Sequence, residues 1–220
     1  GVYVRRSTNN GATWSAPRPL YQTIYMRLLT EEDAHLWLTV DEAGRLYAGW
    51  DDPRLGQSYL TASIDAGETW SDPQPVAPDR GARRARVTLA REAEPLLLWE
   101  AAETGAVGSP TGACALYQQR VTAPATEALT VTLGLSEPEA VLEDLRSCPE
   151  RFALHGRLAE QGALLVIPGE GSLTAAAWNG EQWSEPEAID LSFEHPELDT
   201  RVYPAQPGTL LLGDRLAVFG

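Results

Sequence analysis

The chain has 220 residues, of which 43% are hydrophobic and 22% are charged, a composition typical of a globular protein large enough to bury a core. Its 17 basic and 31 acidic residues give a formal net charge of -14, which would repel phosphate backbones and anionic membranes, so nucleic acid and membrane surfaces are excluded as expected partners. No run of about 18 apolar residues occurs, and we therefore predict no membrane-spanning segment.

The predicted elements, in chain order, are short strands separated by Gly, Asp and Pro turns. The chain opens on a strand-like segment, GVYVRRST, which we expect to continue from a longer protein. Three groups of three strands follow: 34–44, 45–52 and 58–65; then 85–92, 95–101 and 114–121; then 152–160, 163–169 and 173–180. Two last strands are expected at 201–208 and 215–220. The one predicted helix is EPEAVLEDLRS at 137–147, inside a long connection at 123–150.

A sequence repeat runs through these elements. SIDAGETWSDPQPV at 63–76 closely matches STNNGATWSAPRPL at 7–20, and AAWNGEQWSEPEAI at 176–189 is a third, weaker copy. The tryptophans of the copies are residues 14, 70 and 183, so the first separation is about half of the second, and a copy is missing near residue 126. The repeat therefore defines about four units.

Four antiparallel strands per unit at this period predict an all-β fold, a β-propeller with one unit per blade. We expect a single domain over 1–220, with blades at about 34–77, 83–130 and 151–190, and a split blade made of 198–220 and 1–20. Either the two halves of the split blade close a ring of about four blades, or the chain is a segment of a larger propeller. The irregularity of the units favours the segment.

The repeated pattern resembles the Asp-box, or bacterial neuraminidase repeat, of the sialidase-like propellers. The second copy matches in full, the first has Asn9 in place of the Asp, and the third keeps the Gly and the Trp. The matching residues are Ser7, Gly11 and Trp14; Ser63, Asp65, Gly67, Thr69 and Trp70; and Gly180 and Trp183. If the chain is a segment, the resemblance implies that the whole propeller has six blades. It also implies an extracellular or cell-envelope location. It also implies that these residues are structural, in the turn between the third and fourth strands of a blade.

Strand alternation puts a candidate ligand site on the other side of the propeller, since turns after the second and fourth strands share the face opposite the boxes. The candidate ligand-binding residues there are Arg27, Asp51, Asp52, Arg54, Arg83 and Glu100. Mixed acids and arginines suit a polar ligand such as a carbohydrate, or a protein. For each residue alone, the alternative is a solvated loop charge.

The sequence contains no clear motif for catalytic residues. The resemblance implies three arginines, an Asp acid and a Tyr nucleophile, the last an exception among glycosidases. The nearest match to the family's Arg-Ile-Pro phrase is Arg201, followed by Val, Tyr203 and Pro. The candidate catalytic residues are Asp51, Arg201 and Tyr203, but no sequence spacing distinguishes them from other residues of the same types.

The leading functional hypothesis is therefore a non-catalytic module that recognises a glycan or a protein. The alternatives are an exo-sialidase-type hydrolase whose active site lies partly outside this segment, and a segment that only packs against other domains.

No metal site or cofactor is predicted. Cys114 and Cys148 form no C-x-x-C motif, and the three histidines are scattered. Whether the two cysteines form a disulfide is left open.

Overall fold

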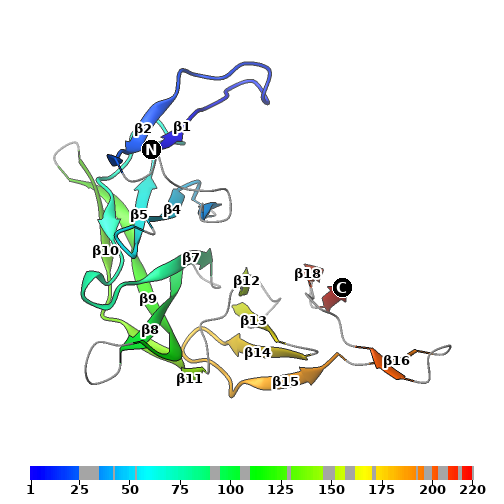
Figure 1. Cartoon of the computed structure of the whole chain (residues 1–220). Helices are drawn as coiled ribbons and strands as arrows, with labels where there is room; N and C mark the ends of the chain where they lie inside the picture. The colour runs from blue at the N-terminus through cyan, green and yellow to red at the C-terminus, as the bar shows by residue number, and fades with distance from the viewer. Residues whose placement is uncertain are drawn as a thin grey trace. The chain divides into compact units, whose positions relative to one another are not determined.

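In a computed structural model, the chain is built of β-strands and the connections between them (Figure 1). The structure describes residues 1–24, 35–41, 43–52, 54–89, 95–104, 110–127, 130–145, 152–156, 162–169, 172–191, 193–195, 200–202, 208–212 and 215–219. Within these ranges, no helix is long and apolar enough to cross a membrane. The predicted all-β class is confirmed.

The chain divides into two compact units, each described here by itself. Unit 1 comprises residues 1–87 and 95–146, and unit 2 comprises residues 88–94 and 147–220.

The first sheet of unit 1 has four antiparallel strands in the order β3 (Leu36–Val40), β4 (Leu46–Asp52), β5 (Gln57–Ser63) and β6 (Gln74–Pro75). Each strand pairs with its neighbour in sequence, as expected for short strands joined by tight turns. Trp37 pairs with Gly49 across β3 and β4. A methyl group on Gly49 would overlap the Trp37 indole, so the tryptophan covers the space that a side chain would need.

A hairpin of β1 (Val2–Val4) and β2 (Arg18–Tyr21) packs against this sheet. The Tyr21 ring lies 5.4 Å from the Trp50 ring and 4.8 Å from the Tyr59 ring, measured between centroids. These aromatic contacts fix the hairpin to the ends of β4 and β5 that lie farther from the β5–β6 loop.

The second sheet of unit 1 has the order β10 (Thr130–Leu135), β9 (Pro110–Glu127), β8 (Pro95–Thr104) and β7 (Arg83–Leu89), and β11 (Glu139–Leu145) also pairs with β9. The predicted helix at 137–147 is therefore wrong, because its residues form β11. Pairing along β9, with Glu139 opposite Gln118, outweighs the helix propensity of this segment. The expected connection at 123–150 instead contains the end of β9, β10 and β11.

The core of unit 1 lies between its two sheets. Buried apolar side chains of β4, β5, β7, β8 and β9 form one cluster, which includes Tyr47, Leu60, Ala62, Val87, Leu97, Trp99 and Val121. The Thr39 hydroxyl adds a hydrogen bond to the Val87 carbonyl. The junction of the sheets is thus held by a continuous apolar contact.

Unit 2 contains one antiparallel sheet in the order β12 (Ala153–Gly156), β13 (Ala163–Gly169), β14 (Ser172–Trp178) and β15 (Glu187–Asp190). Two hairpins follow, β16 (Phe193–His195) with β17 (Thr200–Val202), and β18 (Gly208–Leu212) with β19 (Arg215–Phe219). The segment between the third predicted blade, 151–190, and the split blade that begins at 198 thus contains β16. Blade boundaries, blade number and ring closure stay predictions.

Candidate functional site

The three copies of the repeated pattern lie in corresponding places, each in a loop between two paired antiparallel strands. These loops join β1 to β2, β5 to β6, and β14 to β15. The amide of the serine after each tryptophan donates a hydrogen bond of 2.8 Å to a carbonyl that precedes the turn: Ser15 to Arg6, just after β1, Ser71 to Ala62 in β5, and Ser184 to Ala177 in β14. The copies therefore share one backbone closure.

In the second copy, the polar side chains bond their own loop. The Ser63 hydroxyl accepts from the Gly67 amide at 2.9 Å, and Asp65 accepts from the Thr69 amide at 2.8 Å and the Thr69 hydroxyl at 2.6 Å. The Trp70 indole donates to the Gly67 carbonyl at 3.2 Å. Gly67 has φ 85°, a left-handed conformation that favours glycine. The polar side chains of this loop are therefore engaged in hydrogen bonds within the turn.

The first copy repeats this arrangement with one polarity reversed. Asn9 accepts from the Thr13 amide at 2.9 Å, as Asp65 does from Thr69. Its amide nitrogen, however, donates to the Thr13 hydroxyl at 2.8 Å, whereas the Asp65 carboxylate accepts from the Thr69 hydroxyl. An asparagine therefore replaces the aspartate without loss of a hydrogen bond.

A polar pocket lies at the opposite end of β4 from the β5–β6 loop. β4 begins at Leu46, which pairs with Ser63 beside the loop, and ends at Asp52, which pairs with Gln57. The pocket has a volume of about 190 Å³ and is lined by His35, Leu36, Trp37, Asp51, Arg84, Ala85 and Arg86. It is smaller than the usual ligand pocket of roughly 300–1,000 Å³, so it fits one small polar group.

Asp51 is the carboxylate that lines this pocket. It is 8% exposed, accepts a hydrogen bond from the Ser58 hydroxyl, and receives the Arg84 amide on both oxygens at 3.1 Å. Burial raises the pKa of Asp51, although the bonds from Ser58 and Arg84 act in the other direction. Arg84 has φ 51°, which is uncommon for a residue other than glycine. The Asp51 carboxylate thus stabilises a strained backbone position at the pocket wall.

Glu100, on β8, lies beside Arg84. The two side chains form an ion pair of 2.6 Å, and Glu100 is 1% exposed. Its second oxygen, Oε2, is buried and has no hydrogen-bond partner among the described residues. Burial raises the pKa of Glu100 to about 7, with the Asp51 charge adding to the rise and Arg84 opposing it. Arg84 therefore joins two buried carboxylates, one through its backbone amide and one through its guanidinium.

The other predicted ligand residues are placed differently. Asp52 is fully buried, and its carboxylate accepts from the Tyr21 hydroxyl and from the amides of its own turn at Arg54 and Leu55. Arg54 and Arg83 are exposed. Arg27 and Tyr203 lie outside the described residues, as does the side chain of Arg201, whose backbone is in β17.

Sequence reasoning missed Arg84 and Arg86. Both belong to the basic run RGARRAR, of which Arg83 was selected. The sequence does not show which of the adjacent arginines faces the pocket. Arg84 has a left-handed backbone conformation, which disturbs the regular alternation of side chains along β7.

A metal site is not formed by the described side chains, in which no group of three or more His, Cys, Asp or Glu residues is suitably arranged. Cys114 is disulfide-bonded, and Cys148, the other cysteine of the chain, lies outside the described residues.

The fold and site define an all-β protein with a polar pocket beside a sheet junction. No family model matches the chain, and no curated protein matches it. Among solved structures, the chain is similar to "Hadza microbial sialidase Hz136", at 16% sequence identity and a TM-score of 0.46. The match covers 83% of this chain and 39% of that chain, so this chain spans well under half of that protein.

Proposed function

We propose that the chain is part of a sialidase-like propeller with Asp-box turns, and that its Asp51 pocket is a non-catalytic recognition site for one small polar unit of a glycan. Support for the propeller comes from the repeated sequence pattern, the consecutive strand order of the four-stranded sheets, and the shared closure of the three loops.

The observation that carries the recognition role is the fixed arrangement around Arg84. Its amide is held by Asp51 and its guanidinium by Glu100, so the charged groups are oriented before a ligand arrives. Preorganised polar groups bind with a smaller loss of conformational entropy. Buried charges beside a pocket are costly to keep, and such groups concentrate at functional sites. The pocket volume suits a single sugar residue or a polar side chain.

A binding role fits better than catalysis because Asp51 is already engaged. Both of its oxygens accept hydrogen bonds from the protein, so the carboxylate has a structural role. No tyrosine is among the residues that line the described pocket.

The test is binding of the 220-residue chain to an array of immobilised glycans. We expect selective binding that Asp51→Asn and Arg84→Gln each reduce at least about tenfold, the loss of roughly one charge-assisted hydrogen bond. Arg120→Gln, at an exposed residue on β9, makes the same charge change away from the pocket and should bind normally. Circular dichroism melting checks that the variants fold. Selective binding unaffected by both pocket variants would place recognition elsewhere, and selective binding only to a protein partner would replace the glycan.

A glycoside hydrolase is the second candidate, favoured by the raised pKa of Asp51 beside a Glu100 whose pKa is about 7. A carboxyl that stays protonated near neutral pH can donate a proton to a leaving group. Turnover of a fluorogenic sialoside by the chain, lost in Asp51→Asn, would establish the hydrolase. Binding without turnover would favour the recognition module.

A further inference from the structure

Two of the three asparagines in the chain are followed directly by glycine. The asparagines are Asn9, Asn10 and Asn179, and Gly11 and Gly180 follow the last two. An Asn–Gly pair can react with itself, because the glycine has no side chain to block attack of its amide nitrogen on the asparagine side-chain carbonyl. The contacts that the fold gives to these two groups therefore decide whether each pair reacts.

The two Asn–Gly pairs occupy the same position in the repeated pattern. In each of these copies the tryptophan follows the glycine by three residues. Asn10 lies in the loop that joins β1 to β2, Asn179 lies in the loop that joins β14 to β15, and both are exposed. The chain thus contains a matched pair of sites whose local contacts can be compared.

The side-chain carbonyl of Asn179 is polarised by its own loop. Its Oδ1 accepts hydrogen bonds from the backbone amides of Glu181 and Gln182, at 2.9 Å each. Attack on this carbonyl places negative charge on Oδ1, and two N–H groups already directed at that atom stabilise the charge, as in an oxyanion hole. The loop therefore lowers the barrier to the attack.

The Gly180 amide, which supplies the attacking nitrogen, has no hydrogen-bond partner among the residues that the structure describes. Gly180 is exposed, and a methyl group on it would meet no atom within 4 Å outside the adjacent residues. Hydroxide can therefore remove the amide proton, and water can reach the product of the attack.

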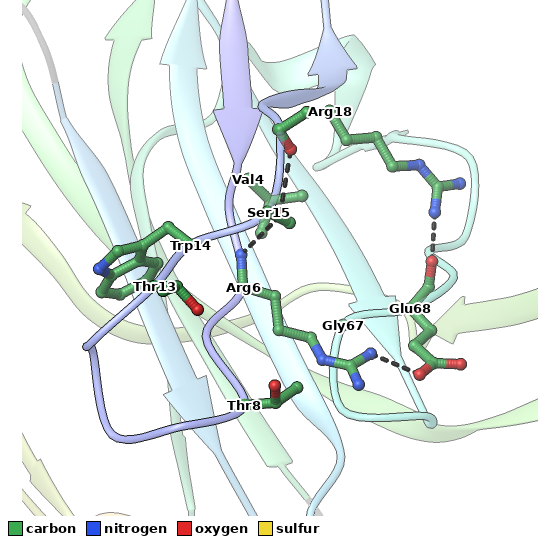
Figure 2. Close-up of a pocket in the computed structure, with 10 residues that line it drawn as sticks. Val4, Arg6, Thr8, Thr13, Trp14, Ser15, Arg18, Gly67 and Glu68 are labelled. Carbon is green, nitrogen blue, oxygen red and sulfur yellow. Dashed lines mark hydrogen bonds and ion pairs between the residues drawn. The ribbon is translucent and has the colours of Figure 1, made fainter.

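The corresponding groups at Asn10 are restrained. The Gly11 amide donates a hydrogen bond of 2.8 Å to the Ser7 hydroxyl, which holds the proton that the amide must lose before it can attack. The loop is also fixed from outside, because Arg6, just after β1, forms an ion pair of 2.7 Å with Glu68 of the loop that joins β5 to β6 (Figure 2). This loop therefore protects its Asn–Gly pair.

We propose that Asn179–Gly180 is a site of self-catalysed deamidation, at which the fold promotes conversion of Asn179 to aspartate and isoaspartate. The Gly180 nitrogen loses its proton to hydroxide and forms a bond to the Asn179 Cγ. The bond from Cγ to the side-chain nitrogen breaks, and that nitrogen takes a proton from water and leaves as ammonia. Water then opens the cyclic imide at either of its carbonyls. The site lies outside the Asp51 pocket and does not depend on the recognition role proposed there.

Deamidation changes the charge and the geometry of the loop. The aspartate product keeps an oxygen in the place of Oδ1 and adds a negative charge beside Glu181. The isoaspartate product runs the main chain through the former side chain, which adds one carbon to the loop and alters both hydrogen bonds to Oδ1. The modification is thus a slow and irreversible change in one of the three loops.

The experiment is timed incubation of the 220-residue chain in mildly alkaline water labelled with heavy oxygen, which marks each new carboxylate, followed by peptide mass spectrometry. Synthetic peptides of residues 6–14 and 175–183 give the rate of each pair without the fold. In the folded chain we expect Asn179 to react at least about tenfold faster than Asn10, a small part of what one oxyanion donor contributes in enzymes. The two peptides should react at similar rates, and Asn179 should react in the fold at least as fast as in its peptide.

Two variants test the assigned groups. Ser7→Ala frees the Gly11 amide and should raise the rate at Asn10 towards that of its peptide, with no change at Asn179. Asn179→Gln should abolish the reaction at this site, because glutamine would have to form a larger ring, and should leave Asn10 unchanged. Circular dichroism melting checks that both variants fold. The proposal would be overturned if Asn179 in the folded chain reacted more slowly than in its peptide, or no faster than Asn10.

Discussion

Replacement of Glu100 by glutamine should stabilise the protein at neutral and alkaline pH. The carboxyl is 1% exposed and its Oε2 has no partner among the described residues, so its ionised form is poorly accommodated. Burial raises its pKa from the ordinary 4.5 to about 7. A carboxyl whose pKa is higher in the folded state contributes stability below its unfolded pKa, and that stability is lost as the pH rises from 4.5 through 7.

The size of the effect follows from the two pKa values. The difference between 4.5 and about 7 corresponds to about 3 kcal/mol, since one pH unit is worth about 1.4 kcal/mol. Glutamine resembles the protonated form, and its carbonyl still accepts from the Arg84 guanidinium. The variant should therefore match the wild type near pH 4 and exceed it by up to about 3 kcal/mol at pH 8.

The assay is urea unfolding, followed by circular dichroism at pH values from 4 to 8.5 for both proteins. The difference between the two free energies of unfolding cancels the titration of distant groups and reports Glu100 together with its coupling to Asp51. Glu137→Gln, at an exposed residue in the segment between β10 and β11, is the control and should show no such divergence. A constant difference across the pH range, or a variant less stable at pH 8, would refute the reasoning.

Three further outcomes concern stability. Gly49→Ala should cost about 1–3 kcal/mol because the added methyl group overlaps the Trp37 indole, and a fall in the urea midpoint measures it. Asp65→Ala should cost about 1–3 kcal/mol through lost bonds in its loop, whereas Asp65→Asn should cost less, as Asn9 already fills the corresponding place; equal losses in thermal melting would contradict this. Trp14→Ala should change the free energy of unfolding by less than about 0.5 kcal/mol, since the ring is largely exposed. A large loss would assign Trp14 to the core.

The strands of the first sheet could be predicted because local signals and tertiary contacts agree there. AHLWLTV and RLYAGWDD are rich in aromatic and aliphatic residues, and the turn between them contains Gly44 at a positive φ. The secondary structure of the segment 137–147, in contrast, was predicted wrongly. Its alanine, leucines and glutamates favour a helix locally, but the long strand β9 offers an edge that the segment pairs with. A sequence pattern cannot anticipate a partner strand of unusual length.

Two of the predicted ligand residues, Asp51 and Glu100, lie on either side of Arg84, a residue that the sequence did not single out. Strand alternation brought both into the candidate list, because each lies where a second strand runs into the loop on the face opposite the boxes. Arg84 joins them through its backbone amide and its side chain. A hydrogen bond from the backbone amide does not depend on the residue type, so the sequence does not reveal it. The ion pair between Arg6 and Glu68 was not predicted either, because it forms where two copies of the repeated turn approach each other.

The reversed hydrogen bond in the first loop gives the two turns different responses to acid. Although burial acts to raise it, bonds from Thr69 and Ser63 hold the pKa of Asp65 below its ordinary value, so the stability it contributes is lost as the pH falls through that lowered pKa. Asn9 makes the corresponding bonds with an amide, which does not titrate. One chain thus carries an acid-sensitive and an acid-resistant version of the same turn. Acid should therefore loosen the loop that joins β5 to β6 while the loop that joins β1 to β2 stays in place.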